Sequence, residues 1–175
     1  NEHSDKGEIP QTVIGQGNTL MTPFHNALLM CAVANDGVLM KPYVIDHIEG
    51  VDNTTVKENI PEIYADLMSK KDAKKLQKML REVVTDGTGY SLDTDLYTAA
   101  GKTGTAENEG KYAHAWFVGY SNVEDPDLVV CVLVENTGAG SKYAVPIAKK
   151  IFNSYYNNNM KEYYGEKKNT AQSDE

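Results

Sequence analysis

Three short apolar segments follow one another closely in the second half of the chain, and they limit its fold more than any other feature. They cover residues 97–106, 113–121 and 128–135, and each has the length and composition of a strand. The turns between them, at 108–110 and 124–127, are short, which makes neighbouring strands antiparallel. The run from Leu128 to Val134 is apolar on both faces, as expected for a central strand that is covered on both sides.

A helix is predicted between Thr22 and Asn35. Thr22 can cap it, Pro23 suits the first helical position, and Gly37 suits the stop. Residues 27–34 are apolar nearly all round, which indicates a buried helix. Residues 38–48 then read as extended, and Pro42 confines that segment to an edge or to the periphery.

Two further helices are predicted, over residues 70–85 and 143–156. Ser69 and Asp72 resemble a capping box at the start of the first one, and Gly87 follows its end. In the second one, Pro146 is acceptable because it falls in the first turn. The expected core positions of the first of these helices form one stripe at helical spacing: Ala73, Leu76, Met79, Leu80, Val83 and Val84. The predicted fold class is α+β, an antiparallel sheet covered by helices.

Composition excludes several functional classes. The 175 residues suit one domain, and the net charge of −8 argues against a nucleic-acid-binding surface. No apolar run approaches the length of about 20 residues that a transmembrane helix needs. The four histidines show no ligand-like spacing, so neither a metal nor a cofactor is expected. Cys31 and Cys131 lie in apolar runs and read as buried hydrophobic residues, with a disulfide left open.

The segment that suggests chemistry is Ala99-Ala-Gly-Lys-Thr-Gly-Thr-Ala-Glu107. A lone Lys-Thr-Gly triplet is weak evidence, but here it lies on the first of the three predicted strands. Its context consists of short motifs in a fixed order: Ile14-Gly-Gln-Gly17, Thr22-Pro23, Ala32-Val-Ala-Asn-Asp-Gly37, Gly87-Thr-Gly89 and Ala115-Trp-Phe-Val-Gly-Tyr120.

In this order and spacing the set resembles the penicillin-binding transpeptidases, from before Ile14 to about Tyr156. It is most similar to the monofunctional class B branch. The resemblance implies the C-terminal portion of the serine β-lactamase and penicillin-binding transpeptidase fold. It also implies a D,D-transpeptidase that cross-links peptidoglycan stem peptides ending in D-Ala-D-Ala, forms a serine acyl-enzyme and is acylated by β-lactams. A D,D-carboxypeptidase and a non-catalytic β-lactam sensor remain alternatives, as does an unrelated binding module.

The resemblance assigns roles to four residues of the site segment. Lys102 supplies fixed positive charge for the substrate carboxylate, and Thr103 and Thr105 offer hydroxyl donors to it. Gly104 lets the strand backbone come close to the substrate. In the family, the backbone N–H at the position of Thr105 forms half of the oxyanion hole, and the N–H of the nucleophile forms the other half.

Strand alternation creates a tension in this assignment. Lys102 and Gly104 should face one side of the sheet, and Thr103 and Thr105 the other. Both pairs can reach one substrate only from an edge strand, so the site strand is predicted at the rim of the sheet. Other residues carry less weight. Gln16 could support the cleft but more simply belongs to a turn, Trp116 is assigned to the core, and Tyr112 and His114 could border the cleft.

The nucleophile is missing from the sequence. No serine has a lysine three residues later or an asparagine two residues later. The chain is therefore expected to be a fragment: residues 1–158 form the C-terminal portion of the domain and 159–175 a flexible polar tail. Alone it should not acylate, and its partner would be the missing N-terminal part of the same domain. The parent is expected at the extracytoplasmic face of the bacterial membrane, held by an anchor outside this chain.

Overall fold

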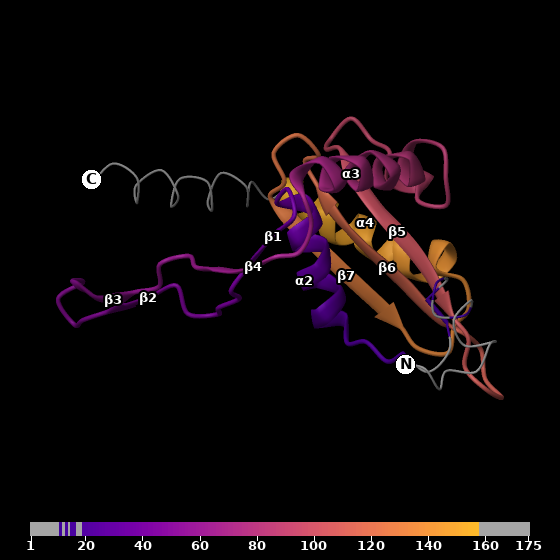
Figure 1. Cartoon of the computed structure of the whole chain (residues 1–175). Coiled ribbons are helices and arrows are strands. Elements are labelled where there is room, and N and C mark those ends of the chain that lie inside the picture. Colours follow the sequence, from indigo (N-terminus) through magenta and orange to yellow (C-terminus); the bar gives the residue numbers. More distant parts are fainter. Residues whose placement is uncertain (1–10, 12, 14, 17–18, 158–175) are drawn as a thin grey trace, which may run out of the picture.

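The computed structural model describes residues 11, 13, 15–16 and 19–157, and the predicted tail at 159–175 lies outside them. Its central element is a three-stranded antiparallel sheet in the order β5-β6-β7 (Figure 1). The strands are β5 (Ala99–Ala106), β6 (His114–Ser121) and β7 (Leu128–Val134). Their registers are continuous, with Thr105 opposite Ala115 and Ala115 opposite Val134. Both the antiparallel pairing and the α+β class are confirmed.

Helices cover both faces of this sheet. Helix α4 (Gly140–Asn157) packs on one face, where Phe117 and Phe152 are fully buried together. Helix α2 (Pro23–Ala34) lies on the other face, where Met30 and Val33 pack with Tyr120. Helix α3 (Lys70–Thr85) runs beside β5, and the short 3-10 helix η1 (Tyr90–Leu92) follows it (Figure 1).

The boundaries of α2 and α3 agree with the capping signals in the sequence, whereas α4 begins three residues before the predicted start, so Pro146 lies in its interior rather than in its first turn. The Thr22 hydroxyl accepts a hydrogen bond from the His25 N–H at 3.1 Å, and Ser69 does the same for Asp72 at 3.2 Å. Gly37 has a φ of 99° just after α2, where its N–H donates to the Ala32 carbonyl at 2.7 Å. These ends form because a hydroxyl or a left-handed glycine satisfies backbone groups that the helix leaves unpaired.

Two burial predictions are wrong in part. Phe24 and Leu29 on α2 are 62% and 42% exposed, and Cys31 is exposed rather than buried. Only one side of α2 has neighbours among the described residues, so its apolar pattern is satisfied on that side alone. On α3 the stripe is rotated from the predicted one, because Gln77 is buried and Met79 is 60% exposed.

An arm between α2 and α3 consists of two antiparallel pairs. Strands β1 (Val38–Met40) and β4 (Ile63–Asp66) form its base, and β2 (His47–Glu49) and β3 (Thr55–Glu58) form its tip. The arm projects far from the sheet (Figure 1). The peripheral extended segment at 38–48 is thus confirmed, whereas β3 and β4 were not predicted. All four residues of β3 are exposed, so neither face of this strand is buried. A strand of this kind does not need the alternation of apolar and polar residues by which a half-buried strand is recognised.

Candidate active site on the edge strand

The predicted site strand, β5, is an edge of the sheet, which confirms the prediction from side-chain alternation. Lys102 lies opposite Val118 and shares its face with Ala100 and Tyr120, the face that packs on α2. Thr103 lies opposite Phe117 and therefore shares the face that packs on α4. The two kinds of side chain thus lie on opposite faces, and the open edge of β5 is where both meet solvent.

The backbone of β5 also alternates between its two sides. The N–H and C=O of one residue point the same way in a strand, and Thr105 accepts a hydrogen bond from outside the sheet at its carbonyl. Its N–H therefore also points to the open edge, as do the N–H groups of Thr103 and Gly101 by alternation. This edge can present amide donors to a ligand.

Lys102 is exposed and lies against its own strand. Its ammonium Nζ donates to the Thr103 carbonyl at 2.8 Å, which holds the charge beside the open edge. Among the described residues no acidic side chain forms an ion pair with Lys102. The positive charge is therefore available to an anionic ligand.

The two threonine hydroxyls have different neighbours. The Thr103 Oγ1 atom lies 2.7 Å from Thr88 Oγ1, in the turn between α3 and η1. The Thr105 Oγ1 atom accepts a long hydrogen bond of 3.5 Å from the N–H of Gly140, the first residue of α4. A hydroxyl in each place can turn its proton toward a carboxylate, because the position of a hydroxyl hydrogen is free to rotate.

Glycines allow close approach on both sides of the strand. A Cβ at Gly104 would lie 3.1 Å from Trp116 Cβ, so Trp116 covers the strand there; it is half-buried rather than in the core as predicted. A Cβ at Gly140 would lie 2.5 Å from the Gly104 carbonyl oxygen. The first turn of α4 can therefore contact the site strand only because residue 140 has no side chain.

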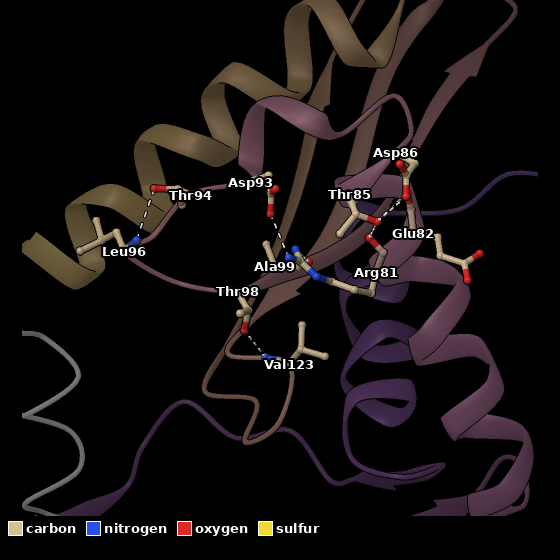
Figure 2. Close-up of polar contacts among 10 residues, drawn as sticks. All are labelled: Arg81, Glu82, Thr85, Asp86, Asp93, Thr94, Leu96, Thr98, Ala99 and Val123. Atoms are coloured by element: carbon tan, nitrogen blue, oxygen red, sulfur yellow. Dashed lines mark hydrogen bonds and ion pairs between the residues drawn. The ribbon is translucent and has the colours of Figure 1, made fainter.

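Side chains from distant parts of the sequence hold the open edge of β5. Figure 2 shows Arg81, which reaches from α3 to donate 2.9 Å hydrogen bonds to the Ala99 carbonyl and to the Asp93 carboxylate. At the other end of β5, the Gln16 amide donates to the Thr105 carbonyl at 2.9 Å and accepts from the Glu107 N–H at 3.2 Å. Gln16 therefore supports the strand, the reading that the sequence favoured less, and Gly15 forms the expected turn with a φ of 78°.

Among the described residues, no hydrogen bond joins the side chain of Tyr112 or His114 to the open edge of β5, although His114 pairs with Ala106 in the ladder. Tyr112 is 77% exposed, and the His114 Nδ1 atom accepts a hydrogen bond from the Asn136 N–H at 3.1 Å. Among the residues that the structure describes, no group of three or more His, Cys, Asp or Glu side chains is placed to hold a metal ion.

The sequence indicated Lys102, Thr103, Gly104 and Thr105 but missed three contributors. Gly87-Thr-Gly89 stood out as a motif, yet nothing in its spacing indicated that Thr88 contacts Thr103, and no signal indicated that Gly140 approaches Gly104. Arg81 carried no signal, because an arginine on a helix is normally solvated.

A separate groove lies elsewhere on the molecule. It has a volume of about 730 Å³ and runs between α2, β1 and the start of β7, lined by residues that include Leu28, Cys31, Tyr43 and Val129. It is on the side of the sheet away from the β5 edge. Its lining is mostly apolar, and Leu28 and Cys31 belong to the helix whose outer side is uncovered.

Comparison with known proteins identifies the family of the chain. Residues 3–153 match the family described as the penicillin binding protein transpeptidase domain. The chain is 31% identical over 156 residues to the peptidoglycan D,D-transpeptidase PbpA of Mycolicibacterium smegmatis. The matched region covers 83% of this chain and 31% of that protein. It is 33% identical over 176 residues to the peptidoglycan D,D-transpeptidase MrdA of Haemophilus influenzae. That match covers 89% of this chain and 27% of that protein. The chain thus spans about a third or less of these relatives.

Solved structures agree with this assignment. Penicillin-binding protein A of Mycobacterium tuberculosis, in its imipenem acyl-enzyme complex, superposes with a TM-score of 0.78 at 29% identity. The match covers 86% of this chain and 34% of that one.

Proposed function

Since this chain belongs to the penicillin-binding protein transpeptidase domain family, we propose that it forms one wall of the active site of a peptidoglycan D,D-transpeptidase. The observation that carries the proposal is the open edge of β5. That edge combines two hydroxyls, outward N–H groups and an ammonium that has no acidic partner among the described residues, all within one four-residue stretch. The ligands that fit it are the terminal carboxylate of a D-Ala-D-Ala stem peptide and the carboxylate of a β-lactam.

Each residue of the stretch has a role in this proposal. Lys102 attracts the substrate carboxylate, and the hydroxyls of Thr103 and Thr105 donate to it. The Thr105 N–H is half of the oxyanion hole, where a single donor contributes about 3–4 kcal/mol to lowering the barrier. Gly104 keeps a side chain off the strand where the substrate backbone would lie.

Another segment of polypeptide supplies the nucleophile in this proposal, because no serine here is followed by a lysine three residues later. We assign that role to the remaining part of the same domain. Two features support a cover of this kind: the uncovered apolar side of α2, with Phe24 and Leu29 exposed, and the apolar groove beside it. Exposed apolar surface of this extent commonly marks an interface.

The substrate defines the location. Peptidoglycan lies outside the cytoplasmic membrane, so the domain would act at its extracytoplasmic face, held by an anchor in another part of the protein. None of the helices that the structure describes combines the length and the apolarity required to cross a bilayer.

The test uses the complete protein and a fluorescent penicillin. Intact-mass measurement should show one penicilloyl adduct on the complete protein and none on the 175-residue chain. Incubation with a stem peptide and an amine acceptor should then give the cross-linked product. Hydrolysis in place of cross-linking would identify a carboxypeptidase, and an adduct on the isolated chain would contradict the assignment of the nucleophile to another segment.

A further inference from the structure

Gln16 is joined to the end of the site strand although 89 residues separate it from Thr105 in the sequence. Its side-chain amide uses both of its functional ends. The Nε2 group donates to the Thr105 carbonyl at 2.9 Å, and Oε1 accepts from the Glu107 N–H at 3.2 Å. The amide thus spans Ala106 and binds the open edge as the peptide group of another strand would.

The backbone that carries Gln16 is itself held in a turn. The Gln16 N–H donates to the Gln11 carbonyl at 2.8 Å, and Gly15 has a φ of 78°, which a glycine adopts without strain. The turn presents the amide to β5, so its position is determined before any ligand arrives.

The point of attachment is next to the expected oxyanion donor. Thr105 is the second-last residue of β5, and the ladder to β6 ends one residue later, at Ala106 opposite His114. A strand end that is bonded on one side only is prone to fray. Gln16 supplies hydrogen bonds on the other side, and by fixing the Thr105 carbonyl it limits rotation of the residue whose N–H points to the same edge.

We propose that Gln16 is a positioning residue, which acts through Thr105 by holding the Thr105 N–H in the direction that an oxyanion requires. This inference rests on the proposed acyl-transfer function. A donor that contributes to the transition state must be aligned within fractions of an ångström, and a small misplacement lowers the rate much more than it lowers binding.

The experiment uses the complete protein and two substitutions of similar size. Gln16→Met removes both hydrogen bonds. Gln16→Glu keeps an acceptor for the Glu107 N–H but loses the donor to the Thr105 carbonyl. Rapid-mixing kinetics with fluorescent penicillin separate the dissociation constant of the non-covalent complex from the acylation rate constant. In Gln16→Met the rate constant should fall between about tenfold and a hundredfold, while the dissociation constant stays close to wild type.

A pH profile of Gln16→Glu adds a signature that general destabilisation lacks. Once protonated, the introduced carboxyl group can donate its O–H to the Thr105 carbonyl and restore the missing bond. The ratio of the variant rate constant to the wild-type rate constant should therefore rise as the pH falls toward about 4.3, the ordinary pKa of glutamate. A flat ratio would contradict the role of the donor.

Gln77→Met is the matched control. The Gln77 amide is buried and donates to the Val33 carbonyl at 2.8 Å, so it joins α3 to α2 and, among the described residues, has no hydrogen bond to β5. This variant should melt at a lower temperature with an unchanged acylation rate constant for the folded protein. An unchanged rate constant in Gln16→Met, or an equal loss in Gln77→Met, overturns the proposal.

Amide hydrogen exchange separates this proposal from the proposed function. Gln16→Met should speed exchange at Glu107, whose N–H loses its acceptor, and at Ala106, the last residue of the ladder to β6, and leave Ala100 protected. A wild-type protein that forms no penicilloyl adduct would overturn the proposed function, whereas unchanged exchange at Ala106 would overturn the positioning role whatever the chemistry.

Discussion

The two edge strands of the central sheet, β5 and β7, differ in the side chains that bind their outward backbone groups and in their own composition. At the β5 edge, outward carbonyls are bonded by side chains from distant segments: Arg81 binds Ala99 and Gln16 binds Thr105. Lys102 occupies the Thr103 carbonyl between them. At the β7 edge the strand is a run of seven apolar or small residues, and neither proline nor a charged residue interrupts it.

This difference indicates two different uses. An edge strand that solvent alone must cover is usually blunted by charges, prolines or bulges, because it otherwise recruits other strands. At the β5 edge, side chains bind outward carbonyls and leave N–H groups facing outward, as the proposed ligand site requires. The β7 edge has the composition of a central strand, so we interpret it as the place where a further strand of the complete domain pairs.

The role proposed for the β5 edge depends most on the charge of Lys102. In the complete protein, Lys102→Ala should lower the rate of acylation by penicillin by about a hundredfold or more. The melting temperature should stay near that of wild type, because Lys102 is exposed and removing it leaves no ion-pair partner without its charge. Stopped-flow acylation and thermal melting of the same samples measure both. An unchanged rate would exclude the role given to Lys102.

A pair of proline substitutions tests the β7 edge. In the pair of Thr105 and Ala115, the backbone N–H and C=O groups of the two residues point away from each other. The N–H and C=O groups of Ala115 therefore point toward those of its other partner, Val134. By alternation Val132 also points to β6, and Leu133 points outward. Val132→Pro should therefore cost about 3 kcal/mol or more in any form of the protein, because it removes a ladder hydrogen bond.

Leu133→Pro distinguishes the two interpretations of β7. In the 175-residue chain its cost should be small, since prolines are accepted on edge strands when the lost N–H faces solvent. In the complete protein the cost should approach that of Val132→Pro. Urea unfolding of both forms measures the free energies. Equal and small costs for Leu133→Pro in both forms would show that no strand pairs there.

The three long helices and the three strands of the central sheet could be predicted from the sequence because their causes are local. Thr22 and Ser69 are capping residues beside the helices that they cap, and the three strands have short turns between them. The edge position of β5 followed from local logic as well, because Lys102 and Thr103 must face opposite sides of any strand.

Side-chain contacts between residues that are distant in the sequence could not be predicted. Nothing near Gln16 indicates that its amide meets Thr105, and the 2.7 Å contact of Thr88 with Thr103 depends on how α3 packs against β5. Burial of α2 failed for a related reason. The apolar pattern of Phe24, Leu29 and Cys31 predicts burial, but among the described residues nothing covers that side of the helix.

Two glycines of β5 are expected to differ in effect: Gly101 is important for stability and Gly104 for the acylation rate. A Cβ at Gly101 would lie 2.7 Å from both the Phe117 ring and the Val118 carbonyl oxygen, so Gly101→Ala should destabilise the fold by about 1–3 kcal/mol. Gly104→Ala meets Trp116 Cβ at 3.1 Å and should cost less than about 1 kcal/mol, since its other surroundings are open. Its acylation rate should nevertheless fall about tenfold. Urea unfolding and acylation kinetics of both variants check this, and the reverse order of effects would contradict it.

The smallest expected effect concerns Asp36, which links the two sides of the comparison. It follows α2, which packs beside β7, and binds three side chains of α3, which packs beside β5. Its carboxylate lies 2.8 Å from Lys70 Nζ and 2.9 Å from Lys74 Nζ, and it accepts from the Gln77 amide at 3.2 Å. These partners, Lys70 first, hold the pKa of Asp36 well below its usual value.

A lowered pKa in the folded state means that the ion pairs stabilise the protein above the ordinary aspartate pKa of about 3.9, and that this stability is lost as the pH falls below it. Because the lysine partners are 74% and 54% exposed, Asp36→Asn should cost less than about 1 kcal/mol at pH 7. Asparagine suits the site, since residue 36 has a φ of 54° and asparagine accepts the left-handed conformation. Urea unfolding at pH 7 and at pH 3 should show the two proteins converging in acid. A difference that is constant with pH would mean that the carboxylate acts through its shape and hydrogen bonds rather than through its charge.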